Sequence, residues 1–351
     1  MKKALLTTVQ IAITVALLYF VFRDPAKRAQ MGTALRLANY WWMALGILAY
    51  AVVEIAAAIR WQVLLRVQGI RLSNGRVGAL FLIGMFYNQF MPGGTGGDII
   101  KSYLLLKETP GKAPGALLAV LFDRLVGLVA LISITGVLIS LRYEWLAQLP
   151  GTRRLLYLLL IVLGSSVLFL LTTFIVSGFN LVKRLPQRVP GREKLIEVSA
   201  AYHLYARHWK ATLVAFAMSL IAHLGTFTTF LCVAYALHAE DMRTTPPSSV
   251  PVLDFFAIMP IERTISSLPI SFGGAGWREI ILQILLSNLA GVPAGVANLI
   301  GSLSFLIILL CALPGGLIYF LYKPSGVRAH VKLSEMRDEV ATVEHDLAAE
   351  K

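Results

Sequence analysis

Charged side chains occur inside apolar stretches of this sequence. Placing one such side chain at the centre of a membrane costs on the order of 2.5 to 3.5 kcal/mol on insertion scales. Each is therefore expected to pair with another charge inside a helix bundle or to contact a polar ligand. The residues in question are Glu54, Arg60, Asp98, Lys101, Asp123, Arg124, Asp254, Glu262, Arg263, Arg278 and Glu279.

A glycine-rich stretch at residues 88–101 contains two of these charges and has the composition of an anion site. If a helix begins at Gly97, Asp98 and Lys101 are three residues apart and share one face. The N–H groups of Gly96 and Gly97 and the Lys101 ammonium would then suit a phosphate. Asp98 has two interpretations: it caps this helix and competes for the same amides, or it takes part in substrate or proton coupling. The other candidate binding residues here are Asn88, Gly93 and Gly94.

A second stretch, residues 268–281, repeats the order of the first. In both, a proline precedes a Gly-Gly-small-Gly turn, and a carboxylate, a basic residue and two isoleucines follow. Arg278 is the strongest candidate for contact with an anionic headgroup, because a guanidinium matches phosphate with two donors. Its alternative role is an internal salt bridge with Glu279 or Glu262. The glycines expected to line this part of the site are Gly273, Gly274 and Gly276.

Two pairs of neighbouring residues complete the predicted site. Asp123 and Arg124 are adjacent in sequence, so on a straight helix they face different directions and each needs a partner on another helix. The same argument applies to Glu262 and Arg263. Arg60 lies near the end of its apolar run, which favours a structural role in which its head group reaches the interface.

The composition excludes an ordinary soluble domain. Of the 351 residues, 57% are hydrophobic and 15% are charged, and the mean hydropathy is +0.72. The formal net charge of +13 comes from short basic clusters between apolar runs, which favours positive-inside topology over nucleic-acid binding. Two distant cysteines provide no disulfide framework or zinc motif. We find no metalloprotease, nucleotide-binding or nucleophile-elbow motif, and we expect no catalytic residue, metal site or cofactor.

The apolar runs predict a multi-pass bundle with both termini in the cytoplasm. With the N-terminal lysines inside, an uncleaved first helix at residues 4–22 and strict alternation place more than twice as many basic residues on the cytoplasmic side as opposite. This requires residues 77–106 to enter and return from the cytoplasmic side, and residues 250–290 to do so from the other. The remaining predicted spans are 41–65, 114–141, 155–176, 211–237 and 292–322.

The predicted fold class is therefore all-α: a polytopic membrane helix bundle with two oppositely oriented re-entrant glycine-loop hairpins that form an inverted repeat. Inverted repeats with interrupted helices indicate an alternating-access transporter, with substrate bound where the broken ends meet. Within the last span, Pro314-Gly315-Gly316 predicts either a kink or close helix packing. Residues 1–322 form the membrane domain, and residues 323–351 form a polar cytoplasmic tail with a short amphipathic helix.

Three blocks in this order resemble the flippase-like family of the lysylphosphatidylglycerol synthase transmembrane region: Asn88 with residues 92–98, residues 123–127, and Pro269 with residues 273–279. The similarity extends to about Tyr322, and because only residues 323–351 follow, we expect no synthase domain. Lys101 stands where the resemblance leads us to expect Arg. The resemblance implies handling of polar lipids in a bacterial or archaeal cytoplasmic membrane.

We therefore expect a transporter that moves or binds a polar-headgroup lipid, such as a phospholipid, glycolipid or polyprenyl phosphate, with an anionic headgroup as partner. Two alternatives remain at this stage. One is an accessory membrane subunit of a glycosyltransferase or lipid-modifying enzyme, and the other is an intramembrane transferase that uses Asp98, Asp123 or Glu279 as general base. The chain could also pair with a second copy of itself.

Overall fold

A computed structural model describes residues 2–90, 96–109, 111–148, 150–179, 192–237, 251–266 and 274–322. The described residues form twelve α-helices and contain no β-strand. In chain order the helices are α1 (Lys2–Phe22), α2 (Pro25–Arg36), α3 (Tyr40–Val67), α4 (Asn74–Phe90), α5 (Gly96–Glu108), α6 (Ala113–Leu146), α7 (Pro150–Gly178), α8 (Arg192–Arg207), α9 (Trp209–Ala236), α10 (Val252–Ser266), α11 (Trp277–Ala290) and α12 (Ala294–Leu321).

Five helices in the described part of the chain are long and apolar enough to cross a membrane: α3, α6, α7, α9 and α12. Their outer surfaces carry large apolar side chains, such as Ile161, Leu168 and Leu317, each more than half exposed. In water such a surface would be unfavourable, whereas lipid tails solvate it. The prediction of an all-helical, multi-pass membrane protein is confirmed, and the predicted spans agree with these helices to within a few residues, except that α6 and α7 extend further.

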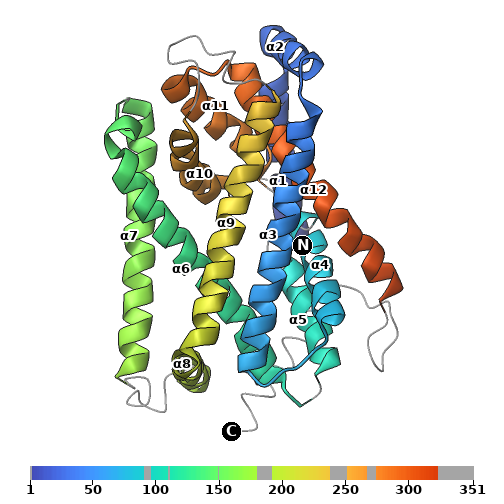
Figure 1. The fold of residues 1–351 in the computed structure, drawn as a ribbon, viewed down its shortest axis with the longest axis vertical. Helices are drawn as coiled ribbons and strands as arrows, with labels where there is room; N and C mark the ends of the chain where they lie inside the picture. Colours follow the sequence, from blue (N-terminus) through green and yellow to red (C-terminus); the bar gives the residue numbers. More distant parts are fainter. Residues whose placement is uncertain are drawn as a thin grey trace.

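The long helices form an elongated bundle in which α3 and α9 pack side by side along most of their length (Figure 1). Two short helices that the apolar runs did not predict lie at opposite ends: α2 next to the start of α3, and α8 next to its end. The Tyr205 hydroxyl of α8 donates a hydrogen bond to the Leu64 carbonyl of α3 at 3.1 Å. Both α2 and α8 carry basic side chains. The predicted topology places these two segments on opposite sides of the membrane, and in the structure they lie at opposite ends of the bundle.

Two helical hairpins lie in opposite halves of the bundle: α4 with α5, and α10 with α11 (Figure 1). These four helices have 17, 13, 15 and 14 residues. At about 1.5 Å per residue the longest is about 25 Å, which is less than the roughly 30 Å of a bilayer's hydrocarbon core. Each hairpin is joined through a glycine-rich stretch that lies wholly or partly outside the described residues (residues 91–95 and 267–273).

Helix α12 packs against both hairpins. It remains helical through Pro314, and a Cβ atom on Gly315 would overlap the backbone of Leu82 in α4, while one on Gly316 would press on the Phe86 ring. Of the two predictions for this motif, close helix packing is therefore the correct one. The predicted helix in the tail, residues 323–351, lies outside the described residues.

Candidate functional site

The α4–α5 hairpin is held together where its two helices approach most closely. A Cβ atom on Gly97 would overlap the Gly84 carbonyl oxygen and the Asn88 side chain, so only glycine fits there. The Gly97 N–H donates to Asn88 Oδ1 at 3.0 Å. Asn88 therefore occupies an amide that the sequence assigned to a phosphate, and it caps the start of α5 in the way expected of Asp98. The residues immediately before α5 lie outside the described residues, so whether Asp98 also caps this helix stays a prediction.

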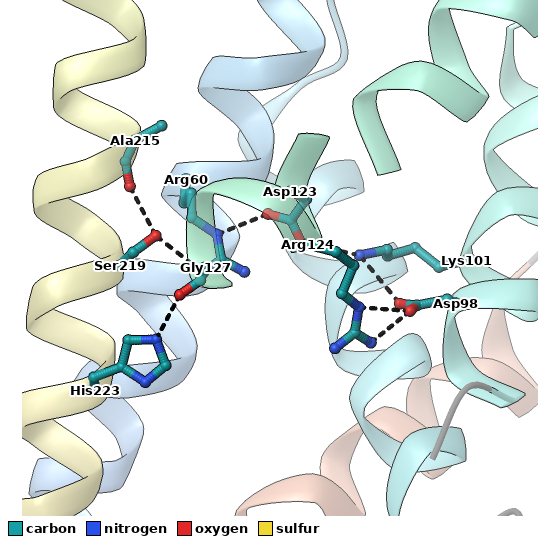
Figure 2. Close-up of polar contacts among 9 residues, drawn as sticks. All are labelled: Arg60, Asp98, Lys101, Asp123, Arg124, Gly127, Ala215, Ser219 and His223. Carbon is teal, nitrogen blue, oxygen red and sulfur yellow. Dashed lines mark hydrogen bonds and ion pairs between the residues drawn. The ribbon is translucent and has the colours of Figure 1, made fainter. Parts of the chain in front are cut away.

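Asp98 instead belongs to a chain of five charges of alternating sign, which we call the charge network (Figure 2). It runs from α3 through α6 and α5 and back to α6, so each link joins two helices or two turns of one helix. Arg60 Nε donates to Asp123 Oδ1 at 2.7 Å, and Lys101 Nζ lies 3.5 Å from Asp123 Oδ2 and 3.7 Å from Asp98 Oδ1. Arg124 closes the chain with Nε and Nη2 at 2.7 and 2.5 Å from Asp98 Oδ2.

Lys101 lies at the centre of the charge network, between the two carboxylates. Lys101 is 4% exposed, and its ammonium lies 4.8 Å from the centre of the Trp61 ring. An aromatic face attracts a cation most strongly when water is excluded. A lysine suffices here because a single compact charge can serve two carboxylates, whereas the expected Arg would need room for a planar fork.

Arg60 is fixed on its other side by α9. Its Nη1 donates to Ser219 Oγ at 3.1 Å, and the Ser219 hydroxyl donates to the Ala215 carbonyl at 3.0 Å. One turn further along α9, His223 Nε2 donates to the Gly127 carbonyl at 3.0 Å (Figure 2). The prediction that Arg60 extends to the interface is wrong, because its side chain is 13% exposed and binds inside the bundle.

The charge network borders a polar cavity of about 100 Å³, which we call the first cavity. This volume has room for several water molecules. Three cations and two carboxylates line it, giving a surplus of one positive charge. Its lining residues are Ala57, Arg60, Phe81, Gly84, Met85, Asn88, Asp98, Lys101, Asp123 and Arg124.

A second group of charges lies at the α10–α11 hairpin. Gly276 precedes α11 with a φ of 85°, a conformation that favours glycine, and its N–H donates to Glu279 Oε2 at 2.6 Å. Ser302 of α12 donates to Glu279 Oε1 at 3.2 Å. Glu279 is thus a structural carboxylate that caps its own helix. Of the two salt-bridge partners expected for Arg278, the structure provides the other one.

That partner is Glu262 on α10, whose Oε1 lies 3.6 Å from Arg278 Nε. Both residues are buried, with Glu262 fully so. The Arg278 guanidinium also lies 4.3 Å from the centre of the Phe305 ring on α12. Arg278 therefore joins three helices, which is the structural role expected as its alternative, and the same residue lines a cavity.

This second cavity has a volume of about 130 Å³, and two arginines, Arg263 and Arg278, line it. Its other lining residues come from α3, α4, α10 and α12: Tyr50, Gln89, Ser266, Phe305 and Ile308. Gln89 follows Asn88 directly in α4, and Asn88 lines the first cavity. The last turn of α4 therefore stands between the two cavities.

A family model described as "Lysylphosphatidylglycerol synthase TM region" matches residues 7–321 of the chain. The chain belongs to this family. The match includes helices α2 to α12 and most of α1, with both hairpins and both cavities. No curated protein matches the sequence significantly. Membership of the family and the apolar helices together establish a multi-pass membrane protein of a family related to lipid synthesis and flipping.

The structure thus brings the predicted residues together in two places. Most of the predicted charges lie at one of the two cavities, and Asp123 and Arg124 do pair with separate helices as expected. Gly274 and Gly276 shape the turn before α11. Gly93, Gly94 and Gly273 lie outside the described residues. The sequence analysis missed Tyr50, Gln89, Ser219 and Phe305, and no spacing rule points to them because they act across helices.

Proposed function

We propose that the protein translocates membrane lipids with anionic headgroups between the two leaflets of a bacterial or archaeal cytoplasmic membrane. The headgroup passes through the first and second cavities while the acyl chains stay in the bilayer. The observation that carries this proposal is the position of α4, whose consecutive residues Asn88 and Gln89 line one cavity each. A headgroup that moves past the last turn of α4 therefore passes from one cavity into the other.

The charges of the two cavities support an anionic cargo. Lys101 already has two carboxylate partners, so a phosphate that enters the first cavity competes with Asp98 and Asp123 for it. In the second cavity Arg263 and Arg278 face the same space, and the fully buried Glu262 balances one of them. Both cavities therefore offer cationic donors that a phosphate can share, at the cost of weakening existing ion pairs.

The two short hairpins support an alternating-access route. We infer that they are re-entrant, α4–α5 from the cytoplasmic side and α10–α11 from the opposite side, and that they form an inverted repeat. Their lengths are insufficient to cross a bilayer, and they lie in opposite halves of the bundle (Figure 1). In this proposal both termini are cytoplasmic, and the protein acts as a carrier with no catalytic residue.

The proposal is tested with purified protein in vesicles that contain a trace of acyl-labelled fluorescent phosphatidylglycerol. An impermeant reductant bleaches only label in the outer leaflet, so transport makes the inner-leaflet label accessible. We expect wild type to expose all of the label and Arg263→Gln to slow this strongly. Arg36→Gln, which removes an exposed guanidinium on α2, serves as the matched control and retains wild-type transport. Full protection of the inner-leaflet label by folded wild type would refute the proposal.

A further inference from the structure

Glu54 lies near the middle of α3 and is a buried carboxyl that lines neither cavity. The residue is 9% exposed, and its Oε1 atom is buried with no hydrogen-bond partner in the described part of the chain. None of the ion pairs among the described residues includes it. A carboxylate without a counter-charge or donor is strongly disfavoured in such surroundings, whereas the neutral acid is tolerated.

The position of Glu54 relates it to both cavities. Tyr50, one turn earlier on α3, lines the second cavity, and Ala57 and Arg60 line the first. With a rise of about 1.5 Å per residue, Glu54 is about 6 Å along the helix axis from Tyr50 and about 9 Å from Arg60. Residues 50, 54 and 57 also follow the spacing of one helix face. A protonatable group thus stands along the route between the two cavities.

The surroundings of Glu54 contain few other titratable groups. Tyr50 and Cys311 of α12 interact with it electrostatically, and Arg263 and Arg278 act in turn on Tyr50. The titratable side chains on the other helices packed against α3 have contacts elsewhere: His223 on α9 with Gly127, Asp123 on α6 with Arg60, and Tyr87 on α4 with Tyr319.

We propose that Glu54 binds the coupling proton, so that one proton crosses the membrane with each anionic lipid. This inference rests on the proposed transport function and adds its energy source. Tyr50 lines the second cavity one turn from Glu54, so a deprotonated Glu54 and a lipid phosphate in that cavity would repel each other. Occupancy of the second cavity by the phosphate therefore requires Glu54 to be neutral, and the empty carrier returns with Glu54 ionised. Acidic side chains within membrane spans serve this purpose in pumps and transporters.

The proton transfer involves no other bond change. Water in the cavity on the acidic side donates a proton to a carboxylate oxygen of Glu54, and the same proton passes back to water when the cavity on the other side accepts the lipid. Coupling of one proton to one monoanionic lipid makes the cycle electroneutral. A difference of one pH unit across the membrane then supports about a tenfold difference in the lipid's leaflet concentrations at steady state, in favour of the less acidic side.

The test uses vesicles with trace fluorescent phosphatidylglycerol and an imposed pH difference of about one unit. We expect wild type to concentrate the label about tenfold in the leaflet on the less acidic side, and Glu54→Gln to equilibrate it equally between leaflets. Glu144→Gln, which neutralises an exposed carboxyl at the end of α6, is the matched control and should respond to the gradient as wild type does.

The outcomes separate this inference from the transport function. Equal label in both leaflets with wild type, or an unchanged response of Glu54→Gln, refutes the coupling and leaves transport intact. No movement of label by folded wild type refutes transport and the coupling with it. If Glu54→Gln transports nothing, pH-difference infrared spectra decide: a carboxylic acid carbonyl band that titrates in wild type and disappears in Glu54→Gln supports the proposal, and a band that persists in the variant overturns it.

Discussion

Replacement of Asp123 by Asn should destabilise the protein more than any other single change in the charge network. Asp123 is 3% exposed and is the only link between Arg60 and Lys101 in the described structure, with its two oxygens 2.7 and 3.5 Å from their nitrogens. Asn has nearly the same shape but no charge, so two buried cations lose their counter-charge at once. Breaking a buried ion pair from one side typically costs about 3 to 5 kcal/mol.

The comparison variant is Arg124→Gln, in which the same network is cut at its exposed end. The Arg124 side chain is 55% exposed, so water solvates Asp98 after the change, and an exposed ion pair contributes only about 0 to 1 kcal/mol. Denaturation of both variants in the same detergent gives the two losses in unfolding free energy. If Asp123→Asn loses no more than Arg124→Gln, the charge network does not hold the bundle together and our reasoning is refuted.

Three further changes have defined outcomes. Gly97→Ala should lower the unfolding free energy by about 1 to 3 kcal/mol, because the added methyl group forces α5 away from the Gly84 carbonyl. Gly136→Ala, with no neighbour near its Cβ position, should be neutral or stabilising, and thermal denaturation compares the two variants. Glu279→Ala should cost about 1 to 3 kcal/mol in the same assay, because it leaves a buried amide at the start of α11 without its acceptor; an unchanged midpoint would contradict the capping role. Arg278→Lys should retain the fold but slow lipid transport, since an ammonium lacks the planar fork; equal rates in the vesicle assay would contradict a phosphate contact.

The long helices could be predicted because a run of more than twenty apolar residues has few alternatives to a membrane span. The start of α3 and the ends of α9 and α12 agree with the expected boundaries to within two residues. Helices α2 and α8 could not be predicted in the same way, because they are short and carry charges, so their stability comes from packing at the ends of the bundle. The Tyr205 hydrogen bond to α3 is an example.

The charged residues of the site were predictable as a set, but their partners were not. Sequence spacing tells only that Asp123 and Arg124 cannot pair with each other; that Arg60 and Lys101 share Asp123 depends on how α3, α5 and α6 pack. The position of the Arg60 head group was predicted wrongly because the argument that it extends to the membrane interface considers a single helix in lipid. A neighbouring helix with a buried acceptor binds the guanidinium better than the distant interface does.

The second cavity was the least predictable feature. Five helices contribute to it, and Tyr50 and Gln89 lie far from the α10–α11 hairpin in sequence. A tyrosine or glutamine in an apolar span normally has an ordinary packing role, so neither residue type carries a signal by itself. Only the placement of α4 next to α12 brings Gln89 to the cavity and makes Asn88 and Gln89 the link between the two cavities.

Photocrosslinking from Gln89 in native membranes tests the central claim most directly. A photoreactive amino acid at this position should form adducts with a phospholipid, and fragmentation should place the link on the headgroup. At Ile161, which is 69% exposed on the lipid-facing surface of α7, adducts should instead form with acyl chains. Acyl-chain adducts alone at Gln89, or adducts only with a second protein, would contradict passage of the headgroup past α4 and favour the role of an accessory subunit.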